Sequence, residues 1–318
     1  MSIRAFSSAF ILATLLGCSH PLTPKETPPP TDTLYDYHIT SATGVPYSLN
    51  ELANALDSAD VILVGEWHTH PGIHLFQAQL LATLAARYPA TALSMEQFSR
   101  PAQPVIDAYL NGDRGEQALL SYTGKWPNYA SDYRPLMEIA KQQALPVIAS
   151  NTTQDIVRCL SSKGESYLDT LPADKRQHVA QQLSSEASPY KEKFFSVMFH
   201  GDEEKTKNQY FAQIAWDDTM AESIVDFLAI HPDFAVMHVA GAFHVEEGLG
   251  IASRIHQRNP DLKIAIISPQ TDDDPLPNDI EDYRLIVKPL PEQWLSEEEM
   301  NAAIGKMRHS SRSQPDCG

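Results

Sequence analysis

Five polar side chains stand directly after short apolar runs of the sequence. Two are carboxylates, two are imidazoles and one is an amide: Glu66 and His68 follow residues 61–64, Glu96 follows 91–95, Asn151 follows 146–149, and His244 follows 234–240. We interpret each run as a buried strand of a parallel sheet, and ligand crevices form outside the carboxyl ends of such strands. One histidine after a strand is most often a structural residue, but the convergence of four segments on one edge predicts a shared site.

The spacing of Glu66 and His68 lets both side chains point to the same side of an extended backbone. If a divalent metal ion is present, imidazole and carboxylate ligands could hold it so that it activates a water molecule. The candidate metal ligands would then be Glu66, His68, Glu96 and His244. The sequence contains no His-Glu-x-x-His motif to strengthen this interpretation.

Two further histidines lie near the start of a helix that we expect over residues 72–88. With Pro71 as its first residue, His70 occupies the N-cap and His74 the first turn. The positive end of the helix dipole suits an anionic ligand group and favours neutral imidazole. The alternative is that both histidines are ordinary surface residues.

An aromatic cluster, Lys125-Trp126-Pro127-Asn128-Tyr129, is followed by Tyr133. Trp126 and Tyr129 could form a flat apolar wall with a phenol at its rim, and a phenolate can ligate ferric haem. The other interpretation is an aromatic loop that caps a helix and closes over the core. In a later helical segment Trp216 and Met220 lie four residues apart on one face, which is more typical of core than of a cofactor site.

The apolar runs alternate with segments of helical periodicity, which predicts an α/β fold with a mainly parallel, doubly wound sheet and helices on both faces. Between the third and fourth strands, about residues 165–230 have helical period throughout, so we expect an all-helical insertion there. The α/β domain would span residues 35–290. The polar tail, residues 291–318, is expected to fray.

The N-terminus reads as a lipoprotein export signal, residues 1–17. A basic start and a short apolar run lead to Leu15-Leu16-Gly17-Cys18, in which Cys18 would carry the lipid. The proline-rich segment 18–34 would be a tether. Ser19 stands where an aspartate would retain a lipoprotein at the inner membrane, so we expect the outer membrane of a Gram-negative cell envelope.

The formal charge of −17 disfavours nucleic-acid binding. No later segment is long and apolar enough to be a membrane span, so the lipid would be the only membrane attachment. Cys159 lies in an apolar helical pattern typical of a buried residue, and whether it pairs with Cys317 stays open. The absence of a Cys-x-x-Cys-His motif argues against covalent haem attachment.

Several of these segments together resemble the ChaN family of haem-binding uptake lipoproteins, within the wider Tiki/TraB/erythromycin-esterase-like superfamily. The matching segments run in order over about residues 58–268: Val64-Gly65-Glu66-Trp67-His68 with Pro71, His74 and Gln77; Met95-Glu96-Gln97-Phe98; Trp126-Pro127-Asn128-Tyr129; Leu145-Pro146-Val147-Ile148-Ala149 with Asn151; Ala212-Gln213 to Met220-Ala221; and Gly241-Ala242-Phe243-His244 with Gly248 and Gly250.

The resemblance implies a role in haem or iron uptake, with haem bound at a homodimer contact and passed to or from an outer-membrane haem receptor. It implies that a tyrosine ligates the iron while a histidine assists. Tyr129 is the first candidate and Tyr133 the second, with Trp126 and His74 nearby. The haem propionates would need local donors such as Lys125, Arg134 or the helix start after His70. His70 replaces an aspartate common in the family, which leaves the coordination open.

The same superfamily includes proteins thought to be metal-dependent hydrolases. The strand-end glutamates and histidines would suit that chemistry as well, so hydrolysis is the alternative function that the sequence supports.

Overall fold

The computed structural model describes residues 33–123, 126–199, 201–272, 281–310 and 317. The expected signal peptide, Cys18, nearly all of the tether and Lys125 lie outside the described residues. Residues Thr31–Gly318 form one compact unit.

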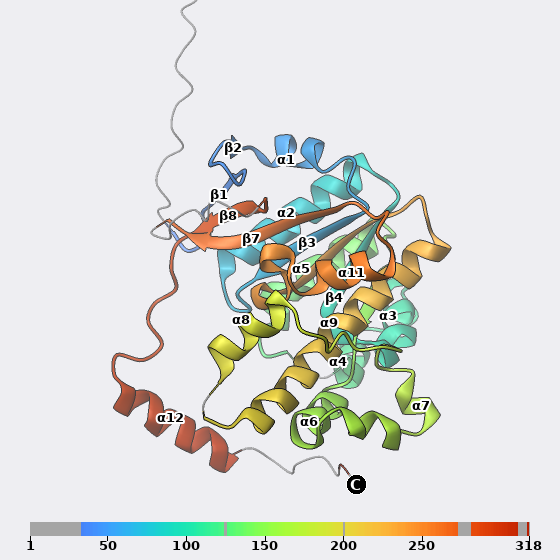
Figure 1. Ribbon diagram of the computed structural model, residues 1–318. Helices are drawn as coiled ribbons and strands as arrows, with labels where there is room; N and C mark the ends of the chain where they lie inside the picture. The colour runs from blue at the N-terminus through green and yellow to red at the C-terminus, as the bar shows by residue number, and fades with distance from the viewer. Residues whose placement is uncertain (1–32, 124–125, 200, 273–280, 311–316, 318) are drawn as a thin grey trace, which may run out of the picture. The chain divides into compact units, whose positions relative to one another are not determined.

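The centre of the molecule is an eight-stranded sheet with the strand order β2-β1-β8-β7-β3-β6-β4-β5 (Figure 1). Strands β3 to β8 are parallel to one another, whereas β1 pairs antiparallel with both β8 and the edge strand β2. The strands are β1 (Tyr37–Thr40), β2 (Pro46–Tyr47), β3 (Val61–Glu66), β4 (Thr91–Ser99), β5 (Val147–Asn151), β6 (Ala235–Gly241), β7 (Ile264–Thr271) and β8 (Tyr283–Val287).

Successive residues of β3 pack into different hydrophobic clusters, because the side chains of a strand alternate between its faces. Ile62 and Val64 pack into the cluster that contains residues of helices α2, α3 and α5, whereas Val61 and Leu63 pack with α9 and α11. The sheet is therefore covered on both faces, and the predicted doubly wound α/β fold is confirmed.

The connecting segments are mostly helical. The α-helices are α1 (Leu49–Ala55), α2 (Pro71–Arg87), α3 (Gln103–Leu110), α4 (Glu116–Thr123), α5 (Arg134–Gln142), α6 (Gln154–Lys163), α7 (Ala173–Arg176), α8 (Pro189–Met198), α9 (Glu203–Ile230), α10 (Ala242–Val245), α11 (Ile251–Arg258) and α12 (Glu297–Ser310). Short helical turns are η1 (Arg100–Ala102), η2 (Tyr129–Tyr133), η3 (Glu165–Thr170) and η4 (Glu246–Gly248).

The segment expected as a helical insertion is helical, but its longest member, α9, packs directly on the sheet and on α6 and α11. The insertion therefore belongs to the same compact unit as the sheet. None of the helices in the described part of the chain is long and apolar enough to cross a bilayer.

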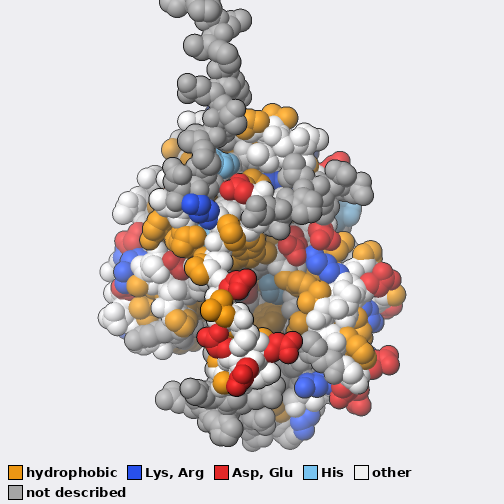
Figure 2. Space-filling model, turned by 90° about the vertical axis from the view of Figure 1, so that its left-hand side faces the viewer, with side chains coloured by type: hydrophobic (Ala, Val, Ile, Leu, Met, Phe, Trp, Pro, Cys, Tyr) orange, Lys and Arg blue, Asp and Glu red, His pale blue; other side chains and the backbone are white. Residues whose placement is uncertain are grey.

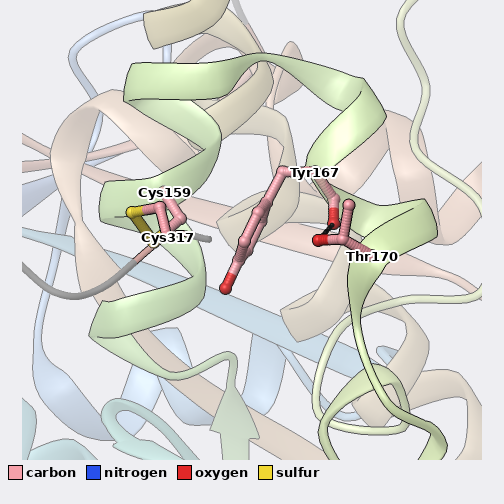
Figure 3. The surroundings of a disulfide bond; sticks show 4 residues. All are labelled: Cys159, Tyr167, Thr170 and Cys317. Carbon is pink, nitrogen blue, oxygen red and sulfur yellow. Dashed lines mark hydrogen bonds between the residues drawn. A yellow bond between two sulfur atoms is a disulfide. The ribbon is translucent and has the colours of Figure 1, made fainter.

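The C-terminal segment is more ordered than its polar composition predicts. It contains α12, and Cys317 forms a disulfide with Cys159 of α6, with 5.5 Å between the Cα atoms (Figure 3). Cys159 is thus buried, as expected, and also covalently bonded. That the polar tail frays stays a prediction; the structure places α12 and the bonded Cys317 in it.

Candidate functional site

The predicted strand-end residues meet at the carboxyl ends of three neighbouring strands, β3, β6 and β4. Glu66 of β3 is in register with Gly241 of β6, and Met95, just before Glu96, is in register with Val239. Strand β7 points towards the same side, which faces the viewer in Figure 2 and is hollowed there. A histidine side chain is visible inside the hollow among hydrophobic side chains. We call this feature the strand-end crevice.

Glu66 is the most heavily bonded group of the crevice. Its Oε1 atom accepts hydrogen bonds from Tyr133 Oη at 2.6 Å and Gln97 Nε2 at 3.1 Å, and it lies 2.8 Å from His68 Nδ1. Its Oε2 atom accepts from Gln77 Nε2 at 2.7 Å. Burial alone would raise the pKa of Glu66, but the hydrogen bonds from its partners and the nearby His74 lower it below its usual value. Glu66 is therefore an ionised anchor for its neighbours.

His68 is the most exposed of the crevice imidazoles, with 43% of its side chain accessible. Its Nδ1 atom bonds to Glu66, and this bond raises the pKa of His68 against the opposing effect of burial. The Nδ1–H group donates to the carboxylate, so Nε2 is the nitrogen with a free lone pair when the ring is neutral.

His244 forms a second imidazole–carboxylate pair. Its Nδ1 atom lies 2.7 Å from Oδ1 of Asp217 on α9, and Tyr190 donates to the other carboxylate oxygen at 2.7 Å. Burial would lower the pKa of His244, but the charge and hydrogen bond of Asp217 raise it to about 9. His244 is therefore an imidazolium at neutral pH, with a proton on both ring nitrogens.

Glu96 and Gly241 connect the two pairs. Glu96 Oε2 accepts a hydrogen bond from the Gly241 backbone at 2.6 Å, and Glu96 Oε1 lies 3.9 Å from His244 Nε2. A Cβ atom on Gly241 would lie 3.2 Å from His68 Nε2 and 3.6 Å from His244 Cδ2, so the two rings flank this glycine. The structure thus brings Glu66, His68, Glu96 and His244 together.

Asn151, the fifth strand-end residue, does not contact the crevice group through its side chain. Its amide donates to the backbone carbonyl of Glu96 at 2.9 Å and accepts from the Thr152 amide at 2.8 Å. It therefore holds the ends of β4 and β5 together.

His70 and His74 occupy the predicted positions in α2, but both are buried and bonded. His70 caps the helix by accepting from Ile73, and its Nε2 lies 2.8 Å from the carbonyl of Lys288. Burial lowers the pKa of His70 and favours the neutral ring. His74 bonds to Gln77 at 2.9 Å and to the His68 carbonyl at 3.0 Å. Both ring nitrogens of His70 and of His74 already have partners in this structure, and the expected anion site at the helix start stays a prediction.

The two candidate tyrosines begin and end η2, a π-helical turn, a rare conformation that occurs frequently at functional sites. Tyr133 is fully buried and donates to Glu66; burial and that carboxylate raise its pKa far above the usual range. Tyr129 is 4% exposed and its hydroxyl has no hydrogen-bond partner, and burial raises its pKa to about 12. In this conformation neither oxygen is open to an external ligand, because both phenols are in the core.

Trp126 packs between these groups, with its ring 5.2 Å from that of His68 and 5.6 Å from that of Tyr133. It lies on the side of the crevice formed by His68, whereas Tyr129, the other member of the expected aromatic wall, is buried. On the opposite side Trp216 packs edge-on against His244 at 5.9 Å. Arg134, an expected propionate partner, pairs with Glu116 instead.

Four polar residues that hold the crevice lie in the segments that resemble the family, but sequence reasoning assigned no role to them: Gln77, Gln97, Gln213 and Asp217. Gln213 and Asp217 lie one helical turn apart on α9, and both reach His244. Polar residues four positions apart within the more apolar middle of this helix were the available signal. Among the described residues, no three His, Cys, Asp or Glu side chains are arranged to hold a metal ion.

Residues 52–255 match the family model described as haem-binding uptake, Tiki superfamily, ChaN. The chain belongs to this family. No curated protein matches this ChaN-family chain. Among solved structures, it is similar to ChaN of Campylobacter jejuni with cofacial haem, at 17% identity and a TM-score of 0.61, over 80% of this chain and 98% of that one. A mutant of the erythromycin esterase EreC shares 13% identity, with a TM-score of 0.44, over 85% and 87% of the two chains.

Proposed function

We propose that this ChaN-family protein is a membrane-anchored haem-binding lipoprotein that takes part in haem or iron uptake. The observation that carries the proposal is the family match over residues 52–255. The similar protein of Campylobacter jejuni is described as binding haem cofacially, and the shared fold supports the same ligand here. The strand-end face is hollowed, and a tryptophan lies beside each of the two imidazoles. These side chains would supply apolar contacts to the flat haem ring.

We propose Tyr129 as the iron ligand, reached by movement of η2. A buried hydroxyl without a partner destabilises the folded state, so exposing Tyr129 to ligate iron would remove that cost. Tyr133 is a weaker candidate because its hydroxyl is bonded to Glu66. Tyr122 of α4, which the sequence reasoning passed over, is 62% exposed and is the competing phenol. His68 would assist from the crevice.

The lipid anchor at Cys18 and an outer-membrane location follow from the N-terminal sequence. The Cys159–Cys317 disulfide supports this proposal, because such bonds persist in oxidising compartments such as the cell envelope. We propose a homodimer with haem at the contact and an outer-membrane haem receptor as partner. Exposed apolar side chains at the end of α8, Val197 and Phe199, would suit such a contact.

A hemin titration of residues 33–318 tests the proposal. We expect a Soret band that saturates at a defined stoichiometry and a doubling of the mass in solution. Tyr129→Phe should weaken binding and remove the phenolate charge-transfer absorption, whereas Tyr133→Phe and Tyr122→Phe should leave that band in place. Titration without saturable hemin binding would contradict the proposed function. Loss of the charge-transfer absorption only in Tyr122→Phe would contradict the assignment of Tyr129 as the iron ligand.

A further inference from the structure

A second hollow lies between α11, the C-terminal half of α9 and the loop of residues 177–188, which links α7 to α8. In Figure 1 this loop crosses in front of α9 and below α11. Its volume is about 1140 Å³, and the strand-end residues are not part of its lining. We call it the α9–α11 groove. It exceeds the roughly 300–1,000 Å³ typical of small-molecule sites, so it has room for a ligand of several rings.

The loop that forms one wall of the groove has no regular secondary structure, and side chains of the helices hold its backbone. Three side chains of α9 accept hydrogen bonds from loop amides at 2.7–3.0 Å: Thr219, Glu222 and Asp218. Arg258 of α11 donates to the carbonyl of Gln182 at 3.2 Å. The wall is therefore in place before a ligand arrives, which lowers the entropic cost of binding.

The cations of the groove are already paired. Each of the three arginines in its described lining lies within 3.4 Å of a carboxylate: Arg100 of Glu222, and both Arg254 and Arg258 of Asp218. Asp226 and Glu186 bring further negative charge to the lining. An anionic ligand would have to disrupt an ion pair and approach other carboxylates, so a phosphate or carboxylate ligand is disfavoured.

Uncharged amides are the polar groups left to face a ligand. Four glutamines line the groove: Gln177, Gln181, Gln182 and Gln257. The hydrogen bonds of Gln181 and Gln182 use their backbone atoms, so within the described part of the chain both side-chain amides are available. An amide has donors and an acceptor, and so does a hydroxyl group, which makes the two well matched. Leu183, Val225 and Leu249 supply apolar contacts for the C–H groups of a ring.

We propose that the α9–α11 groove binds a neutral oligosaccharide, with Gln181 and Gln182 as its main hydrogen-bonding side chains. This site is separate from the proposed haem site and does not depend on it. A glycan of the cell envelope fits the oxidising compartment that the Cys159–Cys317 disulfide supports. Plain hydroxyl sugars and acetamido sugars share the required chemistry, and the experiment separates them.

The test is isothermal titration calorimetry of the full chain, without hemin, in a detergent that has no sugar headgroup. The two probes are triacetylchitotriose and maltotriose, and we expect saturable binding of at least one of them. Binding of the acetylated trimer alone would support the proposal and assign acetamido sugars, such as those of cell-wall glycan. Binding of maltotriose would support it and assign plain hydroxyl sugars.

The double variant Gln181→Ala/Gln182→Ala should weaken this binding by about tenfold, as expected for the loss of two hydrogen bonds. The matched control is Gln142→Ala/Gln143→Ala, which changes two adjacent exposed glutamines at the end of α5, on the other face of the sheet. It should bind as tightly as the wild type. Circular dichroism of both double variants confirms that they are folded.

Trigalacturonic acid, an anionic trimer, should bind more weakly than the neutral trimers. The proposal would be overturned by the absence of saturable binding of both neutral trimers, by unchanged binding in the groove variant, or by tighter binding of the anionic trimer. Hemin binding is measured separately by the Soret band, so failure of the oligosaccharide site and failure of the proposed function are distinguishable.

Discussion

The Nδ1 atom of His244, in the short helix α10 that follows β6, lies 2.7 Å from Oδ1 of Asp217 in the middle of α9. Both side chains are buried, so this pair joins the sheet to the long helix through an ion pair shielded from water. Its strength depends on the proton that His244 carries.

Stability should therefore depend on pH through His244. Its folded pKa of about 9 lies above its unfolded value of 6.5, so the pair contributes fully below about pH 6.5, and the contribution is lost as pH rises through about 9. Asp217→Asn should remove this slope between pH 6.5 and 9, as urea unfolding at several pH values would show. Parallel pH profiles for both proteins would contradict the assignment.

Tyr133→Phe tests the anchoring of Glu66. The substitution keeps the ring and removes one hydrogen bond to a buried carboxylate, so we expect a loss of about 1.5–3 kcal/mol in the free energy of unfolding. Tyr122→Phe, at an exposed tyrosine, is the matched control and should change stability by less than about 0.5 kcal/mol. Denaturant titration of both variants measures the two losses, and equal losses would contradict the anchoring role of Tyr133.

Gly241→Ala tests the gap between the two imidazoles. The backbone angles of Gly241, φ −52° and ψ 141°, suit alanine, so the effect should come from crowding of the His68 ring alone. We expect the NMR signals of the His68 ring to shift, with little loss of stability. Gly115→Ala, where a Cβ meets no atom within 4 Å, is the control.

The disulfide should contribute measurably to stability. Cys317→Ser removes a cross-link between residues 158 positions apart, and we expect a loss of about 2–5 kcal/mol in the free energy of unfolding. Thermal melts of wild type and variant, each with and without reductant, measure it. A melting temperature of the wild type that does not respond to reductant would show that the bond is absent in solution.

Lipidation at Cys18 is tested by palmitate labelling in cells. The basic start, apolar run and Gly17-Cys18 junction predict a labelled, processed wild type and an unlabelled Cys18→Ala precursor. Equal labelling of both would rule out the anchor.

The sequence was sufficient to predict β3, β4, β5 and β6, since a strand buried on both faces reads as a continuous apolar run. Strand β1 was missed because Tyr37–Thr40 mixes polar and apolar residues and pairs with β8, which is far along the chain. Glu66, His68, Glu96 and His244 could be grouped because they follow parallel strands. Asp217 could not, because it lies inside a helix whose apolar pattern indicated core.

The burial of Tyr129 could not be predicted from the sequence either. A phenol in an aromatic loop can face water or core, and the choice depends on how η2 turns. The local sequence of η2, which contains no glycine or proline, does not indicate a π-helical turn.

The disulfide makes the chain from Cys159 to Cys317 a closed covalent loop. His244 and Asp217 lie inside this loop, whereas Glu66, His68 and Glu96 lie on the linear part that precedes it. A protease that cuts the loop once therefore cannot release any fragment, and both halves of the crevice stay on one molecule. Such a cut would become visible on a denaturing gel only after reduction, so a protease could nick this protein without separating the two groups of crevice residues.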